Sequence, residues 1–123
     1  MSRRFRPGLR GAPADVVDDL RRRRITPHRV ESATTKRDFI EAVAAALDFP
    51  GWTGRNWDAL VDALGDLSWL PRGPHALVWS RPDVLRAADP AAYQTGVRLL
   101  RDAADASAGT DRPLTVLLLR GND

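Results

Sequence analysis

Three carboxylates recur at four-residue intervals in the middle of the chain, at Asp58, Asp62 and Asp66. Residues four apart lie one above the other on the same side of an α-helix. Each pair of like charges at this spacing destabilises an isolated helix by about 0.2–0.5 kcal/mol. The pattern therefore allows two interpretations. It is a solvated acidic face, or it is a set of anions positioned in advance for a basic partner.

No arrangement of residues in the sequence predicts catalysis. His28 and His75 each follow a proline, and we expect both to be surface residues in connecting segments. Asp58 and Asp62 could form a glycosidase-type acid pair, or a metal site with Asp102, but no His or Cys joins them at a ligand spacing. No glycine-rich phosphate loop follows a strand. We expect a protein that is not an enzyme, with no catalytic residue, metal or cofactor.

The acidic stretch predicts a loop that leads into a helix. Asn56 is a good N-cap, because its side-chain oxygen can accept a hydrogen bond from an amide of the first turn. Trp57 and Val61 flank the carboxylates, which project from one side of the helix. The opposite side has apolar residues at helical spacing, which predict a buried face: Leu60, Ala63, Leu64 and Leu67.

The remaining segments predict an α/β protein. Short apolar runs predict buried strands at residues 76–79 and 114–119, and residues 25–30 predict a weaker first strand. Capping residues and apolar periodicity predict three further helices, at about residues 35–47, 82–88 and 90–106. Because strands separated by helices favour parallel pairing, we expect a small three-stranded parallel sheet packed with about four helices. The last strand should be central in this sheet.

Basic charge is concentrated near the N-terminus. Residues 1–30 carry nine Arg and three Asp, whereas the remainder carries ten Lys or Arg and thirteen Asp or Glu. Residues 1–14, rich in Arg, Gly and Pro, predict a flexible arm, and residues 15–24 could form a short helix. We expect an arginine-rich arm over residues 1–24 and one domain over residues 25–123. Nucleic-acid contact is expected only through the arginine run Arg21, Arg22, Arg23 and Arg24.

The composition argues against several other classes of protein. A membrane-spanning helix needs an apolar run of roughly 18 residues or more, and no run in the sequence approaches this length, which disfavours a membrane span and a membrane partner. The segment 1–20 lacks the apolar stretch of a secretory signal. The chain has no Cys, so disulfide and thiol chemistry are excluded. We expect a cytoplasmic protein.

Residues 50–64 resemble the signature of the barstar family. The shared positions form one contiguous run: Pro50, Trp52, Gly54, Asn56, Asp58-Ala59-Leu60, Asp62 and Leu64. The resemblance extends in order from about residue 30 to residue 119, and it does not cover the N-terminal segment up to about residue 20. It implies a three-stranded parallel sheet packed with helices, in agreement with the pattern above.

The resemblance also implies inhibition of a bacterial guanyl-type, barnase-like ribonuclease, whose basic active-site cleft is plugged by the acidic helix and its preceding loop. Asp62 aligns with the acid that enters the phosphate-binding pocket, and Asp58 and Asp102 align with further interfacial acids. Trp52 aligns with an aromatic residue near the catalytic histidine of the enzyme. The other expected contact positions are Gly54, Asn56, Trp57 and Val61, and Asp66 extends the acidic face.

Some residues depart from the family pattern. Arg55 places a cation beside the acids, where it could pair with Asp58, and Thr53 replaces a bulky aromatic. We expect an immunity or antitoxin-like inhibitor that is monomeric when free. The alternatives are a barstar-fold module that binds a different basic protein, or RNA contact through the arginine-rich arm.

Overall fold

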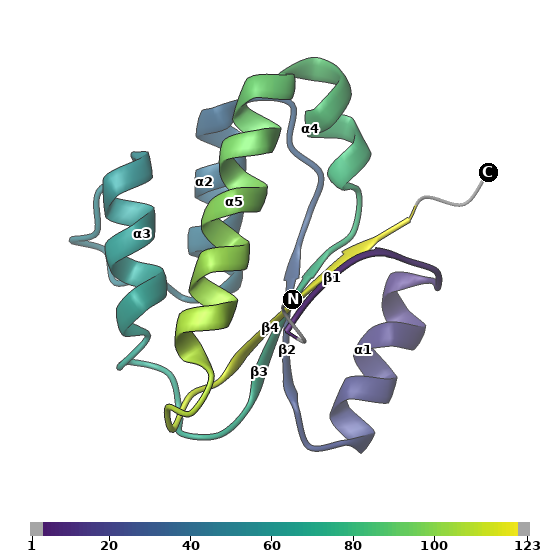
Figure 1. The fold of residues 1–123 in the computed structure, drawn as a ribbon, viewed down its shortest axis with the longest axis vertical. Coiled ribbons are helices and arrows are strands. Elements are labelled where there is room, and N and C mark those ends of the chain that lie inside the picture. Colours follow the sequence, from purple (N-terminus) through teal and green to yellow (C-terminus); the bar gives the residue numbers. More distant parts are fainter. Residues whose placement is uncertain (1–3, 121–123) are drawn as a thin grey trace.

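The computed structural model describes residues 4–120, which form four strands and five helices within that range (Figure 1). In chain order the elements are β1 (Phe5–Leu9), α1 (Pro13–Arg22), β2 (Thr26–Val30), α2 (Lys36–Ala46), α3 (Trp57–Asp66), β3 (His75–Trp79), α4 (Pro82–Ala88), α5 (Pro90–Ser107) and β4 (Leu114–Leu119). None of these helices is long and apolar enough to cross a membrane.

The four strands form one parallel sheet in the order β1-β4-β3-β2. The two inner strands, β3 and β4, pair in continuous register from His75 opposite Leu114 to Trp79 opposite Leu118. All five residues of β3 are buried, as are five of the six in β4. Strands covered on both faces read as continuous apolar runs, which confirms the prediction that residues 114–119 are central.

Helices cover both faces of the sheet unequally (Figure 1). The larger core joins one sheet face to α2, α3, α4 and α5, and its largest buried side chains include Trp79 and Phe39. A smaller core joins Leu20 of α1 to side chains on the other sheet face: Ala76, Val78, Leu117 and Leu119. Helix α3 lies outermost in the larger layer, where it packs against α2 and α5.

The predicted number of three strands is wrong. The additional strand, β1, pairs with β4 at the edge of the sheet, and its register shifts between Arg6 and Leu9. It comes from the segment that we expected to be an arm, of which residues 1–3 lie outside the described range. The sequence of β1, FRPGL, contains Pro and Gly and has no strand-like alternation, so pattern analysis does not detect it. The boundary at residues 24 and 25 stays a prediction.

The prediction that His28 and His75 are surface residues is also wrong. Both lie within paired strands, His28 in β2 and His75 in β3, and their exposed fractions are 9% and 2%. The flanking prolines suggested connecting segments because proline interrupts the hydrogen bonding of a strand. Pro27 nevertheless lies in β2, which is an edge strand of the sheet.

Candidate functional site

The loop before α3 and the start of that helix are fixed by local hydrogen bonds. Asn56 has an extended backbone, and its Oδ1 accepts a hydrogen bond from the Ala59 amide at 2.8 Å, which confirms the predicted N-cap. A Cβ on Gly54 would lie 3.3 Å from the Ala59 Cβ. The loop therefore passes close to the first turn of α3, and Gly54 makes this approach possible.

Helix α3 divides into an apolar and an acidic side as predicted. Leu60, Ala63 and Leu64 are buried, whereas the side chains at Asp58, Asp62 and Asp66 are exposed. Among residues 4–120, no Lys, Arg or His forms an ion pair with these three carboxylates. The acidic side thus presents charge to solvent without internal compensation in the described part of the chain.

A cleft of about 230 Å³ separates the α2–α3 loop from α3. The walls of the cleft come from the loop, from α3 and from one residue after α3. The lining residues are Trp52, Thr53 and Gly54 of the loop, Ala59, Asp62, Ala63 and Asp66 of α3, and Trp69. The Thr53 Oγ1 is buried and has no hydrogen-bond partner in the described chain. The cleft therefore combines apolar walls with the carboxylates of Asp62 and Asp66.

Two large apolar side chains are exposed, one on the loop and one on α3. Trp52 is 82% exposed and Val61 is 47% exposed. Trp57, by contrast, is half-buried: its ring lies 6.2 Å from that of Phe39, and the Lys36 Nζ lies 5.3 Å from the ring centroid. Of the three, Trp57 is thus partly a packing residue, whereas Trp52 adds little to the packing of the free chain.

Arg55 does not pair with Asp58. Its Nε lies 3.3 Å from Glu41 Oε2 on α2, and its Nη1 donates hydrogen bonds to the carbonyls of Thr53 and Gly54 at 2.7 and 3.3 Å. The guanidinium therefore ties the loop to α2 and is neutralised there. The acids of α3 remain the uncompensated charges of this region.

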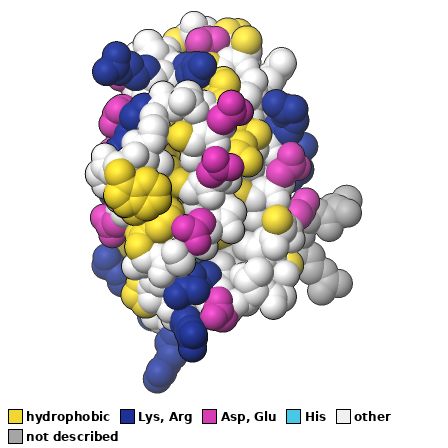
Figure 2. Space-filling model, turned by 90° about the vertical axis from the view of Figure 1, so that its left-hand side faces the viewer, with side chains coloured by type: hydrophobic (Ala, Val, Ile, Leu, Met, Phe, Trp, Pro, Cys, Tyr) yellow, Lys and Arg dark blue, Asp and Glu magenta, His cyan; other side chains and the backbone are white. Residues whose placement is uncertain are grey.

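On the face of the molecule that carries α3, acidic and basic side chains occupy different regions (Figure 2). Acidic side chains gather over its middle beside exposed apolar side chains, while Lys and Arg lie toward its edges. Asp102 is exposed on α5, the helix against which α3 packs, and neither Asp102 nor Asp58 lines the cleft. Such a surface can attract a cationic partner, and its apolar groups can then be buried against that partner.

Sequence reasoning missed Trp69, which forms part of the cleft wall. Its Nε1 donates a hydrogen bond to the Leu47 carbonyl at 2.8 Å, and its ring packs edge-on against Phe49 at 5.6 Å. The only signal was an aromatic residue in a segment expected to be a connector. Among residues 4–120, no group of three or more His, Cys, Asp or Glu side chains could hold a metal ion.

The fold and this face define an α/β protein with an exposed acidic helix beside an aromatic loop. Residues 24–119 match the family model described as Barstar (barnase inhibitor). The chain belongs to the barstar family. No curated protein matches its sequence. Residues 4–23, which include β1 and the whole of α1, precede the matched region.

Proposed function

We propose that this protein inhibits a barnase-like bacterial ribonuclease by placing α3 and the loop before it in the active site of the enzyme. The observation that carries the proposal is the acidic side of α3, where Asp58, Asp62 and Asp66 are exposed and have no cation partner in the described chain. Membership of a family described as barnase inhibitors supports it. On this proposal the protein has no catalytic activity of its own.

Electrostatics gives the reason for binding. A ribonuclease must hold a phosphodiester, so its active site presents cationic side chains. A carboxylate resembles part of a phosphate group and can accept two parallel hydrogen bonds from an arginine. One ion pair at about 4 Å and an effective dielectric constant of about 20 contributes roughly 4 kcal/mol before desolvation. We assign Asp62 to the phosphate pocket, as the resemblance of residues 50–64 to the barstar signature implies. Its exposed position on α3, in the cleft beside Trp52, is compatible with this role.

Rigidity gives the reason for using a helix. Three like charges on one side of α3 repel one another in the free protein, yet the buried side and the Asn56 cap hold them in place. Groups that are already ordered lose less conformational entropy on binding.

On this proposal the free chain is a monomer and acts in the cytoplasm as an immunity or antitoxin-like protein. Asp102, Trp57 and Val61 lie at the edge of the interface with the ribonuclease.

An RNA-cleavage assay tests the proposal. Barnase at fixed concentration is titrated with the intact chain, and cleavage of a fluorogenic RNA is followed. The proposal predicts loss of cleavage that is complete near one equivalent of protein. Full cleavage at a large excess of the chain would remove barnase as a target. Capture of a basic protein other than a nuclease would then favour the alternative of a barstar-fold module with a different partner.

RNA contact is the second candidate, favoured by the arginine run at the end of α1. Arg21 and Arg24 are exposed and form no ion pair within residues 4–120, whereas Arg22 and Arg23 both pair with Asp19, at 3.6 and 3.2 Å. Replacing the four arginines with Gln should abolish a salt-sensitive RNA gel shift if this candidate is right. If the unaltered protein gave no RNA gel shift, RNA contact through these arginines would be excluded.

A further inference from the structure

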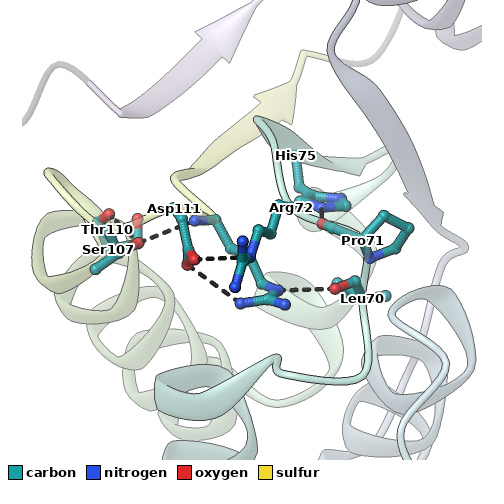
Figure 3. Close-up of polar contacts among 8 residues, drawn as sticks. Leu70, Pro71, Arg72, His75, Ser107, Thr110 and Asp111 are labelled. Atoms are coloured by element: carbon teal, nitrogen blue, oxygen red, sulfur yellow. Dashed lines mark hydrogen bonds and ion pairs between the residues drawn. The ribbon is translucent and has the colours of Figure 1, made fainter.

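Two buried histidines lie at the base of the sheet, outside the acidic site. The Nε2 of His28 is 2.8 Å from the Nδ1 of His75. The Nδ1 of His28 lies 3.0 Å from the Ala46 carbonyl oxygen, and the Nε2 of His75 lies 2.7 Å from the Pro71 carbonyl oxygen. Figure 3 shows the contact between the ring of His75 and the carbonyl of Pro71, which lies in the turn before β3.

A count of protons fixes the charge of this chain of hydrogen bonds. Both ends are carbonyl oxygens, which only accept, so each outer ring nitrogen must carry a proton. The contact between the two rings needs a third proton. Two neutral imidazoles supply two protons in total, and the short contact between the rings would then bring two lone pairs together. One additional proton, shared between His28 and His75, satisfies all three contacts.

A second additional proton has no acceptor. It would place an N–H of His28 against an N–H of His75 and would put two positive charges in a buried site. Burial lowers the pKa of His28 below its ordinary value of 6.5, against the effect of its hydrogen bond to the Ala46 carbonyl, and the charges of His75 and Asp48 act in opposite directions. On the adjoining turns, Arg72 and Arg112 are engaged with Asp111 (Figure 3).

The histidine pair holds both ends of the segment that carries the acidic site. Ala46 is the last residue of α2, directly before the α2–α3 loop, and Pro71 follows α3 by a few residues. Between these two residues lie the loop with Trp52 and the whole of α3. The hydrogen bond from Trp69 to the Leu47 carbonyl joins the two ends of this segment to each other.

We propose that His28 and His75 share one additional proton near neutral pH and form an acid-labile clamp on residues 47–70. Uptake of the second proton breaks the contact between the rings. The Ala46 and Pro71 carbonyls, each bonded to one ring, are then no longer joined to each other through the histidine pair. The clamp follows from the contacts of the free chain. Its consequence for inhibition, a weaker hold on the loop and α3 in acid, rests on the proposed function.

The direction of the pH effect follows from linkage. A histidine in the opened segment takes up its proton near 6.5, whereas the pKa of His28 in the closed segment is lower. The open form therefore binds more protons below 6.5, and the closed form loses stability as the pH falls through that range. For one extra proton, the opening equilibrium rises about tenfold for each pH unit.

Nitrogen-15 NMR of the imidazole rings of the unaltered chain tests the shared proton. The proposal predicts that three of the four ring nitrogens are protonated near pH 7, with averaged shifts for the two that face each other. Two protonated nitrogens out of four at this pH would overturn it. So would uptake of the second proton with no change in the spectrum of residues 47–70.

Amide hydrogen exchange tests the clamp. After correction for the intrinsic exchange rate, opening of residues 47–57 should rise as the pH falls below 6.5, with a slope that approaches about tenfold per pH unit, while α5 stays protected. A double variant, His28→Gln with His75→Gln, keeps amide donors for the Ala46 and Pro71 carbonyls but has no titrating ring, so this acid dependence should disappear. An equal rise in the loop and in α5 would contradict the clamp. None of these measurements uses a ribonuclease, so their failure is distinguishable from failure of the proposed inhibition.

Discussion

At the scale of single residues, charged side chains that are close in sequence differ in whether they have an ion-pair partner within the chain. Arg55 has a carboxylate partner in Glu41, whereas Asp58 and Asp62 have no partner in the described chain. The exposure of the acids could be predicted, because helical spacing is a local property. The partner of Arg55 could not, because Glu41 lies on another helix and the contact depends on the tertiary fold.

Trp52 and Trp57 provide the prediction at this scale. Trp52→Ala should change the free energy of unfolding by less than about 0.5 kcal/mol, because the ring is 82% exposed in the free chain. It should weaken ribonuclease binding by about 2 kcal/mol, since a rigid aromatic buried in an interface is a common hot spot. Urea unfolding and inhibition titration measure the two effects separately.

The matched variant is Trp57→Ala, which removes the packing against Phe39 and the contact with Lys36. This variant should lower the free energy of unfolding by about 2 kcal/mol, as a partly buried aromatic does. If Trp52→Ala destabilised the free chain as much as Trp57→Ala, the assignment of Trp52 to a partner surface would be wrong.

At the scale of elements, the helices were more predictable than the strands. Thr35, Asn56 and Asp89 cap three helices through side-chain oxygens that accept from an amide three residues later, and each of these signals is local. Strand β1 has no such signal, because its place depends on pairing with β4 at the other end of the chain. The buried histidines were missed for the same reason, since their partners come from another strand and from turns.

Gly96 gives the prediction for helix packing. A Cβ at this position of α5 would lie 2.9 and 3.1 Å from the Phe39 ring, which is fully buried. Gly96→Ala should therefore destabilise the protein by about 1–3 kcal/mol through overpacking, despite the better helix propensity of Ala. Chemical denaturation measures this change.

Gly65 in α3 is the matched control. A Cβ there meets no atom within 4 Å, so Gly65→Ala should stabilise the protein by up to about 1 kcal/mol. If both substitutions stabilised the chain, α5 could not lie as close to α2 as the contact with Phe39 requires.

At the scale of the whole molecule, the sheet separates two surfaces. One layer carries the acidic helix, and the other face carries α1 with its arginine run. The larger layer could be predicted from the order of strands and helices. The smaller layer could not, because Leu20 of α1 is buried against side chains of β3 and β4, which lie far from it in the sequence.

Leu20 tests whether α1 packs against the sheet. It is 7% exposed and contacts apolar residues of β3 and β4, so Leu20→Ala should lower the free energy of unfolding by about 2–3 kcal/mol. Arg21→Ala, at the next position of the same helix, should change it by less than about 0.5 kcal/mol. Equal, small effects of the two substitutions would mean that α1 is not anchored.

The central claim is that the charge of α3 neutralises a cationic ribonuclease site, and the binding of Asp62→Ala to barnase tests it most directly. Removing Asp62 should weaken binding by about 2–5 kcal/mol, because cations of the enzyme would be left buried without a partner. Asp18→Ala removes the same charge from the exposed side of α1 and should leave the affinity nearly unchanged. Equal affinities of Asp62→Ala and the unaltered chain, measured by calorimetry or by inhibition of RNA cleavage, would contradict the account.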